Sequence, residues 1–381
     1  MTRSFGKTID WLLFAALLPI LGAGLITMKS FSPDPSSAEL FFNKQIIWVL
    51  ISFVLFFSLA HLDFRFLKRT DLLVALFFIS CAMLLILLVS GHTVRGSASW
   101  FSFGSFSFQP ADAAKLVLIL ILAKYFSRRH VEIRAAKHIL ISGLYAFLPL
   151  VLIFFQPDFG SAAIIFLIWL GVAIVAGISK KHLLVMFLIG ALLFGGLWSF
   201  VFKDSQKDRI RTFLNPLTDV HNSGWNAYQS MIAVGSGQIL GKGVGFGTQS
   251  RLKFLPEYQT DFIFAAFAEE WGFGGVVLLL ILYGVVIWRI LASTLVGSGN
   301  FEIFFGVGLS IFLMSHIIIN IGMNMGLLPI TGIPLPFISY GGSHLVIEFA
   351  ALGILASMRN YSRATHSDDT QKEFIGLEKN T

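Results

Sequence analysis

The sequence predicts an all-α protein that crosses a membrane many times. Of its 381 residues, 56% are hydrophobic and 13% are charged, and the mean hydropathy is +0.79. So few polar residues cannot cover the surface of a soluble protein of this size. The basic residues, which give a net charge of +7, fall between long apolar runs. This placement indicates membrane topology and not a nucleic-acid surface.

Ten apolar runs are long enough to cross the bilayer as helices, which takes about 20 residues each. They cover residues 9–28, 45–61, 70–90, 110–126, 138–155, 158–177, 182–200, 262–288, 303–328 and 340–358. The first run has basic residues before it, as a signal peptide does, but no small-residue cleavage site follows, so we expect it to remain as a helix. We therefore predict a transmembrane domain over residues 1–358 and a polar cytoplasmic tail over residues 359–381.

Basic residues in the short loops predict the orientation of the helices. They gather after the second, fourth, sixth, eighth and tenth runs, at Arg65, Lys68, Arg69, Arg128, Arg129, Arg134, Lys137, Lys180, Lys181, Arg289, Arg359 and Arg363. Short cytoplasmic loops carry an excess of Lys and Arg. This side, which includes both termini, is therefore predicted to be cytoplasmic.

The long polar segment 201–261, between the seventh and eighth runs, is predicted to be a large extracytoplasmic loop. Its cations include Arg209, Arg211 and Lys242, on a side where basic residues are otherwise few. An anionic ligand would account for them. Lys242 lies in the glycine-rich stretch GSGQILGKGVGFGTQS, whose backbone could approach a phosphate closely. The alternative is a flexible glycine-rich connector.

Asp261 lies where this loop meets the eighth run, within RLKFLPEYQTDFIFAAFAEEWGFGG. We expect it in the first turn of a helix, where unpaired N–H groups and the helix dipole favour the ionised form. An ionised aspartate can accept a proton. On local pattern alone, the alternative is that Thr260 and Asp261 only cap the helix.

Charged residues inside the predicted spans are costly in lipid, so they are expected to be paired or functional. The fourth run begins QPADAAK, with Asp112 and Lys115 on one helix face, and the sixth follows QPD, which contains Asp158. An ion pair between Asp112 and Lys115 and a ligand role for them are equal alternatives. Both helix N-termini face the outer side, where a pyrophosphate could bind.

Later runs carry further polar residues. His316, Asn320 and Asn324 are spaced by four and share one helix face, which favours hydrogen bonds between helices over a metal site. Buried acids could ligate a hard cation, carry protons, or be neutral and hydrogen-bonded. These three alternatives apply to Glu269, Glu270 and Glu348.

Two short outer segments border the same side. The loop before the fourth run holds Arg95 and Trp100, a cation and an aromatic that could contact a ligand or anchor the chain at the membrane surface. The segment TGIPLPFISYGGS, residues 331–343, combines prolines and glycines in a rigid reversal. We expect it to direct Ser343 toward a cleft on the outer side.

Several separated strings together resemble one known family. FQPADAAK, QPDFGSA, FLPEYQTDFIFAAFAEEWGFGG and GIPLPFISYGGS are similar to signature segments of the SEDS family (shape, elongation, division and sporulation), over residues 95–358. GTQS at 247–250 is more similar to the elongation members than to the division members. The resemblance implies ten helices with cytoplasmic termini in a bacterial cytoplasmic membrane. It also implies a peptidoglycan glycosyltransferase that polymerises lipid II outside that membrane, with a class B penicillin-binding protein as partner.

The resemblance also implies roles for single residues. Asp261 matches the family's essential aspartate, and other positions match by motif: Arg95, Trp100, Lys115 and Asp158. Asp112 departs from the pattern, because the family usually has Glu in a QPSE string and this chain has QPAD. The negative charge is kept on a shorter side chain.

The resulting hypothesis is that Asp261, as general base, deprotonates the 4-hydroxyl of the acceptor GlcNAc, which attacks C1 of the donor MurNAc with inversion. A divalent cation, Mg²⁺ or Mn²⁺, is expected to help neutralise the leaving pyrophosphate, with Asp112 and Glu269 as ligands. No organic cofactor is expected. Substrate is expected to contact Arg95, Trp100, Lys115, Asp158, Arg209, Arg211, Lys242, Glu257, Thr260 and Ser343.

Two other function classes fit parts of the pattern. Charges such as Asp112, Lys115 and Asp158 inside spans would suit a lipid II flippase. A non-catalytic scaffold for a penicillin-binding protein is the third hypothesis. The clustering of polar residues at the outer mouth favours the enzyme.

Overall fold

The structure is a computed structural model that describes residues 10–30, 35–90, 99–103, 106–128, 136–200, 204–215, 223–252, 254–255, 257–295 and 299–359. Its helices before the outer segment are α1 (Trp11–Ser30), α2 (Pro35–His61), the 3₁₀ helix η2 (Phe64–Lys68), α3 (Thr70–Ser90), α4 (Pro110–Ser127), α5 (Ala136–Phe155), α6 (Phe159–Ala176) and α7 (Lys180–Phe200). After them come α8 (Asp204–Leu214), α9 (Ser223–Ser236), α10 (Thr248–Arg251), α11 (Ile263–Leu295) and α12 (Asn300–Asn324). Residues 342–359 are also helical.

Among the described residues, eight helices are long and apolar enough to cross a membrane: α1, the part of α2 from Phe41, α3, α5, α6, α7, α11 and α12. They coincide with eight of the ten predicted runs. The other two runs are helical as well, as α4 and residues 342–359. Helix α4 is not among the eight because its 18 residues carry three charged side chains: Asp112, Lys115 and Lys124. The count of ten crossings stays a prediction.

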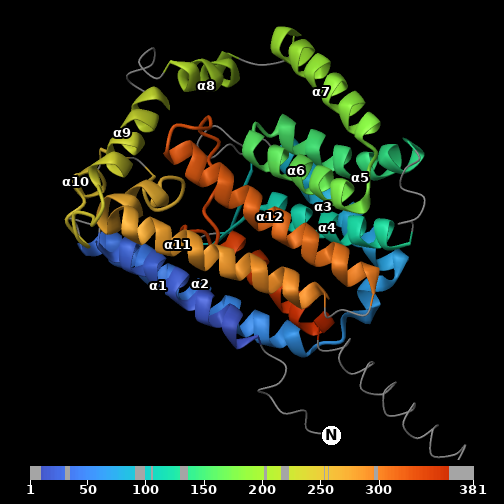
Figure 1. Cartoon of the computed structure of the whole chain (residues 1–381), viewed down its shortest axis with the longest axis horizontal. Helices are drawn as coiled ribbons and strands as arrows, with labels where there is room; N and C mark the ends of the chain where they lie inside the picture. Colours follow the sequence, from blue (N-terminus) through green and yellow to red (C-terminus); the bar gives the residue numbers. More distant parts are fainter. Residues whose placement is uncertain are drawn as a thin grey trace, which may run out of the picture.

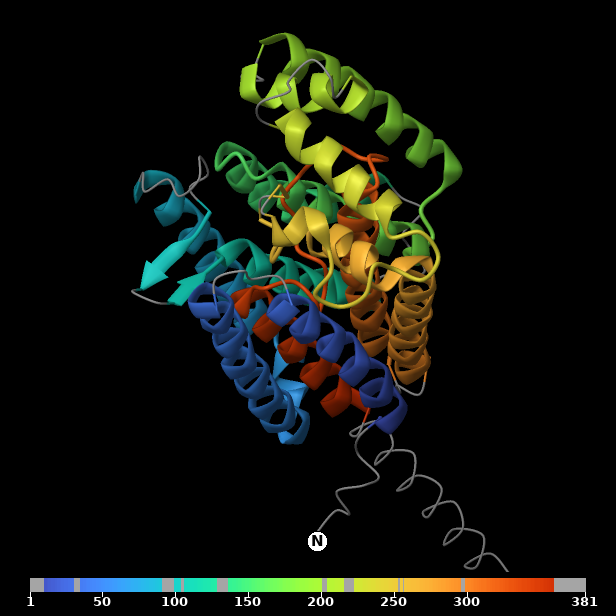
Figure 2. The same cartoon turned by 90° about the vertical axis from the view of Figure 1, so that its left-hand side faces the viewer.

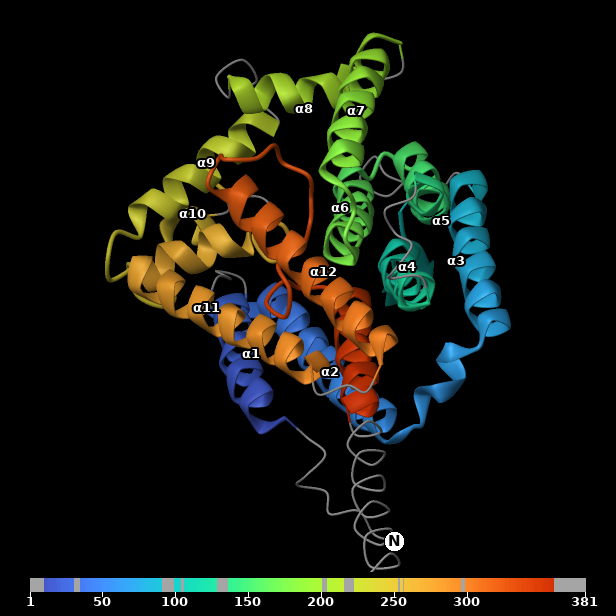
Figure 3. The same cartoon turned by 45° about the vertical axis from the view of Figure 1, so that its right-hand side comes forward.

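Helix α12 lies at the centre of the bundle and packs against α4, α6 and α11 (Figure 1). Helix α1 packs on α2 and α11, and α3 and α5 pack on α4. Helix α7 lies at the edge, away from α11 and α12 (Figures 1 and 3), and its large apolar side chains, such as Phe187 and Leu192, are exposed. Such a surface suits contact with lipid.

The segment predicted as a long loop, residues 201–261, contains three helices, α8, α9 and α10. Helix α9 packs against α11 and α12, so this part of the chain folds back onto the bundle (Figure 2). The buried Ala233 of α9 contacts a small apolar cluster with Phe262 and Ala266. Burial of this face explains why a polar segment forms helices here.

A short hairpin is a feature that the all-α prediction missed. Strands β1 (Phe101–Phe103) and β2 (Phe106–Phe108) pair antiparallel, with Phe101 opposite Phe108, and project from the bundle (Figure 2). The string FSFGSFSF alternates Phe and Ser, which is the period-2 pattern of a strand. That local signal was sufficient to predict the hairpin.

Helix α11 is interrupted at Gly272, whose φ is 66° and ψ is −170°. The loop 238–243 runs against the break: Phe273 and Gly274 donate N–H bonds to the carbonyls of Gln238 and Ile239 at 2.8 and 3.0 Å. A Cβ on Gly272 would lie 2.1 Å from the nitrogen of Gly241. Glycine at both positions therefore lets the two backbones touch.

One end of the bundle is closed by an ionic contact among three helices. Asp10, just before α1, accepts hydrogen bonds from Arg289 of α11 at 2.6 Å and from Arg359 at the end of the last helix at 2.7 Å. The start of the described chain and its end thus lie on the same side as Arg289, as the charge pattern predicted. That this side faces the cytoplasm stays a prediction.

Candidate active site

Asp261 lies in a turn that directly precedes α11. The carbonyl of Glu257 accepts the N–H groups of Thr260, Asp261 and Phe262 at 3.1–3.2 Å. These bonds close a tight turn, and the helix begins at Ile263, so Asp261 stands just before the helix and not in its first turn. The side chain is partly exposed. The predicted junction between a polar loop and an apolar helix is therefore present, with the helix beginning two residues after Asp261.

The segment 331–343 lies directly against this turn. Ser339 Oγ donates to the carbonyl of Thr260 at 2.7 Å, and the N–H of Tyr340 donates to the carbonyl of Gln259 at 2.8 Å. Ser339 Oγ also accepts the N–H of Leu335 at 2.8 Å. The proline-rich reversal predicted from TGIPLPFISYGGS thus holds the residues on the N-terminal side of Asp261.

Helix α12 also binds this turn. The side-chain amides of Asn320 and Asn324 each donate to the carbonyl of Asp261 at 3.0 Å. The predicted hydrogen bonding between helices is confirmed for Asn324, whose Oδ1 accepts the N–H of Ala265 in α11 at 3.2 Å, whereas Asn320 bonds to the turn before that helix and to the carbonyl of Ile333. Asp261 is therefore held through its main chain.

Gly332 borders the carboxylate of Asp261. It is exposed, its φ is +73°, and a Cβ there would lie 3.4 Å from Asp261 Oδ2. A side chain at this position would cover part of the carboxylate. The glycine leaves one side of the Asp261 carboxylate open toward the surface.

Glu257 and Thr260 line the rim of the turn. Thr260 Oγ1 donates to Glu257 Oε2 at 3.3 Å, and Glu257 is exposed. Between them, burial raises the pKa of the Tyr258 hydroxyl, against the effect of a hydrogen bond from Gln259. The Tyr258 hydroxyl therefore stays protonated at neutral pH. Whether Glu257 and Thr260 contact a substrate stays a prediction.

Lys242 and Glu269 form an ion pair at 2.7 Å. The Glu269 carboxylate is fully buried and also accepts the N–H and hydroxyl of Thr248 at 2.8 and 2.9 Å and the N–H of Gln249 at 3.2 Å. The next residue, Glu270, accepts the N–H of Gly245 at 2.6 Å. The glycine-rich stretch is thus bound to α11 at several points and is not a free connector.

The arginines of α8 differ in their surroundings. Arg211 forms an exposed ion pair with Asp208 at 3.2 Å. Arg209 lines a small, mostly apolar pocket that lies between α8, Met231 of α9 and Ile330 in the segment after α12. A cation at the rim of an apolar pocket suits an amphiphilic anion.

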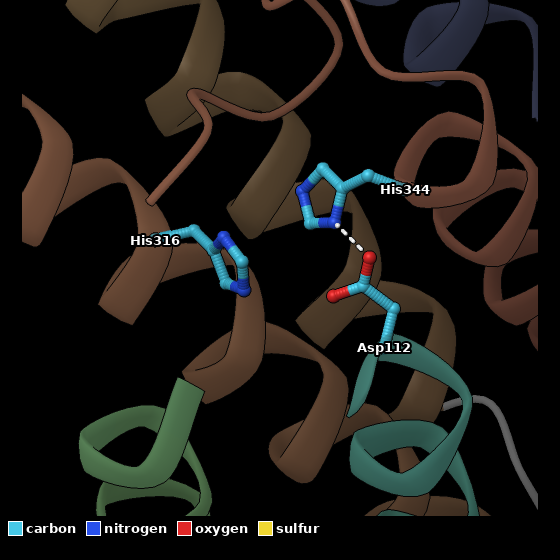
Figure 4. Close-up of side chains that lie close together, drawn as sticks. All are labelled: Asp112, His316 and His344. Atoms are coloured by element: carbon cyan, nitrogen blue, oxygen red, sulfur yellow. Dashed lines mark ion pairs between the residues drawn. The ribbon is translucent and has the colours of Figure 1, made fainter. Parts of the chain in front are cut away.

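Asp112 and Lys115 form an ion pair at 2.9 Å, and both side chains are buried. His344 lies on the other side of Asp112, with Nδ1 3.3 Å from Asp112 Oδ2 and Nε2 3.0 Å from Glu348 Oε1. Its ring stacks on that of His316 at 4.5 Å between centroids (Figure 4). Three helices, α4, α12 and 342–359, meet at this cluster.

The cluster of Asp112, His316 and His344 contains one of the two predicted metal ligands, Asp112. Ligand atoms of Asp112, His316 and His344 lie within 4.8 Å of one another, but imidazole donors suit transition metals better than Mg²⁺. The Lys115 ammonium already neutralises Asp112 and lies 3.5 Å from His316 Nε2. Glu269 is occupied by Lys242 in a different cluster. Asp112 and Glu269 thus have different partners, and their joint role as ligands of Mg²⁺ or Mn²⁺ stays a prediction.

His344 was not singled out from the sequence. A histidine and a glutamate four residues apart, His344 and Glu348, within a predicted span are a detectable signal, because both face the same side of a helix. Their partner Asp112 lies far away in the chain. Only the tertiary structure brings the three together.

Asp158 and Ser343 meet at Gln109, at the start of α4. Gln109 Nε2 donates to Asp158 Oδ2 at 3.1 Å, and its N–H donates to Ser343 Oγ at 3.1 Å. Asp158 Oδ1 also accepts the N–H of Ser161 at 2.9 Å and so caps α6. These contacts join the N-termini of two helices, α4 and α6.

Two predicted contact residues precede the hairpin. Trp100 is partly exposed and lies next to β1. Arg95 lies outside the described residues. A ligand role for either stays a prediction.

Comparisons with known proteins identify the family. A family model for the cell cycle proteins FtsW, RodA and SpoVE matches residues 9–364. Stage V sporulation protein E of Bacillus subtilis is 36% identical over 365 residues, which cover 93% of this chain and 98% of the relative. Peptidoglycan glycosyltransferase MrdB of Escherichia coli K12 is 37% identical over 287 residues, 75% of this chain and 77% of the relative.

The fold has a similar counterpart among solved structures. A chain from a structure described as "Structural coordination of polymerization and crosslinking by a peptidoglycan synthase complex" matches with a TM-score of 0.79 and 30% identity, over 93% of this chain and 98% of that chain. Sequence, family model and fold agree. The chain therefore belongs to the family of cell cycle proteins that includes FtsW, RodA and SpoVE, the SEDS family that its motifs resemble.

Proposed function

We propose that this chain is a peptidoglycan glycosyltransferase that polymerises lipid II at the outer face of the bacterial cytoplasmic membrane. Relatives that carry this activity in their names, such as MrdB, support the proposal. The observation that carries it is the placement of Asp261: a partly exposed aspartate beside an exposed glycine, on a turn held by two other segments.

In the proposed reaction Asp261 takes the proton of the acceptor's 4-hydroxyl as the oxygen attacks C1 of the donor sugar. The C1–oxygen bond to undecaprenyl pyrophosphate breaks, and the pyrophosphate leaves with the bonding electrons. Such a leaving group needs neutralised charge more than a proton, so one carboxylate is sufficient, in contrast to the carboxylate pair of glycosidases.

Cations for the pyrophosphate are proposed among the outer residues. Arg209 is the best placed, because it borders an apolar pocket that suits the lipid's first isoprene units. Lys242 and Arg211 are already paired with the carboxylates of Glu269 and Asp208, so each would interact with the pyrophosphate and with its acidic partner at once. Arg95 completes the proposed set.

The test is polymerisation of lipid II by the purified protein and by its Asp261→Asn variant in detergent. The variant should lose about 10²–10⁴-fold in rate, the usual contribution of a general base. Glycan synthesis at the wild-type rate would refute the assignment. Gel filtration of both proteins checks that folding is unchanged.

The buried pair Asp112 and Lys115 is the observation that favours a second function, transport of lipid II. Lipid II supplied directly to the outer side separates the two functions. A polymerase makes glycan from it, whereas a flippase leaves it unchanged. Full activity of a partner complex that contains the Asp261→Asn variant would instead support a scaffold.

Further parts of the proposal follow the family. We propose ten membrane crossings with both termini in the cytoplasm, the outer position of residues 201–261, and a class B penicillin-binding protein as partner. A role in elongation and cell shape, like that of RodA, is proposed over one in division or sporulation because of the GTQS string. Mg²⁺ or Mn²⁺ is proposed as activator; removal by EDTA should abolish polymerisation, and re-addition should restore it.

A further inference from the structure

Asn320 and Asn324 are one helical turn apart on α12, and both are completely buried. Asn320 Nδ2 donates to the carbonyl of Asp261 at 3.0 Å and to that of Ile333 at 2.7 Å. Because Ile333 follows Gly332, this one amide links the Asp261 turn to the segment that borders its carboxylate.

Asn324 connects the same turn to two further elements. Its Nδ2 donates to the carbonyl of Asp261 at 3.0 Å, and its Oδ1 accepts the N–H of Ala265 in α11 at 3.2 Å. The hydroxyl of Ser230 in α9 donates to the same oxygen at 3.1 Å. Asn324 thus bonds to Asp261, just before α11 begins, and to Ala265, in the first turn of α11.

The two amides also bond to each other. Asn324 Nδ2 lies 2.8 Å from the carbonyl of Asn320 and 3.3 Å from its Oδ1. Each amide oxygen therefore accepts at least one bond, and each amide nitrogen donates more than one. A network with all its members satisfied resists rotation of any one of them, so the Asp261 peptide has one preferred orientation.

We infer that Asn320 and Asn324 are positioning residues for the reaction, which fix the Asp261 peptide and so direct its carboxylate to the open side at Gly332. The inference rests on the proposed function of Asp261 as general base. Neither asparagine contacts substrate, because both are buried beneath the turn. Their effect is therefore on the rate of the chemical step and not on lipid II binding.

The experiment measures kcat and KM for lipid II in Asn320→Leu and Asn324→Leu, which keep the branching pattern of the side chain and remove the amide. A displacement of about 1 Å at a reacting group can reduce a rate about 10²-fold. We therefore expect kcat to fall about 10- to 100-fold with KM within about twofold of wild type.

The matched control is Tyr283→Phe. Tyr283 is buried in α11 and donates to the carbonyl of Pro336 at 2.6 Å, so the control removes a buried bond to the same 331–343 segment away from Asp261. We expect its kcat to stay near wild type. An equal loss of kcat in the control would overturn the inference, because general loosening would then explain it.

A double-mutant test separates positioning from structural damage. In the Asp261→Asn background, Asn320→Leu should change the residual rate by less than about twofold, since the group that it positions is gone. A further tenfold loss would contradict the inference. If Asn320→Leu does not fold, Asn320→Gln, which keeps the amide one methylene farther out, should fold and lose kcat to a smaller extent; an unchanged kcat in Asn320→Gln would overturn the inference.

The two proposals fail in different ways. If Asp261→Asn is active, the general-base assignment is wrong. If Asp261→Asn is inactive while both asparagine variants keep wild-type kcat, only the positioning role is wrong.

Discussion

Two aspartates at different positions in the bundle are bound through different groups. Asp10 uses its side chain: the carboxylate accepts bonds from Arg289 at 2.6 and 3.0 Å and from Arg359 at 2.7 Å. Asp261 is held by its main-chain carbonyl, through the amides of Asn320 and Asn324. At Asp10 the carboxylate itself joins helices, whereas at Asp261 two buried amides of α12 bind the main chain.

The charge state of Asp10 fits its structural role. Burial raises the pKa of this carboxyl, but the hydrogen bonds from Arg289 and the Leu13 N–H, with the charge of Arg359, outweigh burial and lower the pKa below its usual value. Asp10 is therefore ionised throughout the physiological range and has no proton to exchange there.

The largest expected effect comes from Asp261→Asn. Polymerisation should fall by about 10²–10⁴-fold, while the thermal unfolding midpoint stays within about 1 °C of wild type, because asparagine keeps the main-chain carbonyl that α12 binds. Activity assays and a thermal-shift measurement in the same detergent test both parts. A large drop in the midpoint would show that the carboxylate itself holds the turn, and the contrast with Asp10 would then fail.

Glu269→Gln tests a third acid that is held like Asp10. Neutralising the buried Glu269 removes the charge that pairs with the partly exposed Lys242, so the free energy of unfolding should fall by about 3 kcal/mol. The loop 241–249 should also become more sensitive to proteolysis. Glu257→Gln, an exposed acid near the same site, is the control and should change stability by less than about 0.5 kcal/mol.

Asp10→Asn should have a smaller effect on stability. The pair with Arg289 is partly exposed, with 21% of the arginine side chain accessible, so solvent screens the interaction and a loss of about 1–2 kcal/mol is expected. The folded fraction should polymerise lipid II at the wild-type rate. A loss of kcat without a loss of stability would mean that Asp10 acts on the reaction and not only on the helices.

The smallest effect is the pH dependence of the Asp10 contact. Because its folded pKa is lowered, the stabilisation is complete above the unfolded pKa of about 4 and is lost as pH falls through the folded value. The difference in unfolding midpoint between wild type and Asp10→Asn should therefore be constant from pH 5 to 8 and shrink below about pH 4. A difference that shrinks near pH 7 would contradict the lowered pKa.

Much of the helical framework could be predicted from the sequence, because a helix in lipid satisfies its own backbone and needs only a long apolar run. The position of Asp261 at the base of α11 was also predictable, since polar and apolar composition change there. The alternation of Phe and Ser in β1 and β2 was a readable signal that was not used.

The partners of the charged residues could not be predicted in the same way. Glu269 pairs with Lys242 because a glycine-rich loop folds back onto a broken helix, and His344 meets Asp112 because two distant helices cross. Such pairings depend on the packing of whole elements. Sequence spacing identified only the pair within one helix, Asp112 and Lys115.

The break in α11 limits how this chain can change over time. At Gly241 a Cβ would lie 2.1 Å from the carbonyl oxygen of Glu270, and at Gly272 it would lie 2.1 Å from a backbone nitrogen. A single added methyl group at either place would force apart the two main chains, the 238–243 loop and α11 at its break. Evolution can therefore replace neither glycine without shifting the backbone, although neither glycine contributes a functional group.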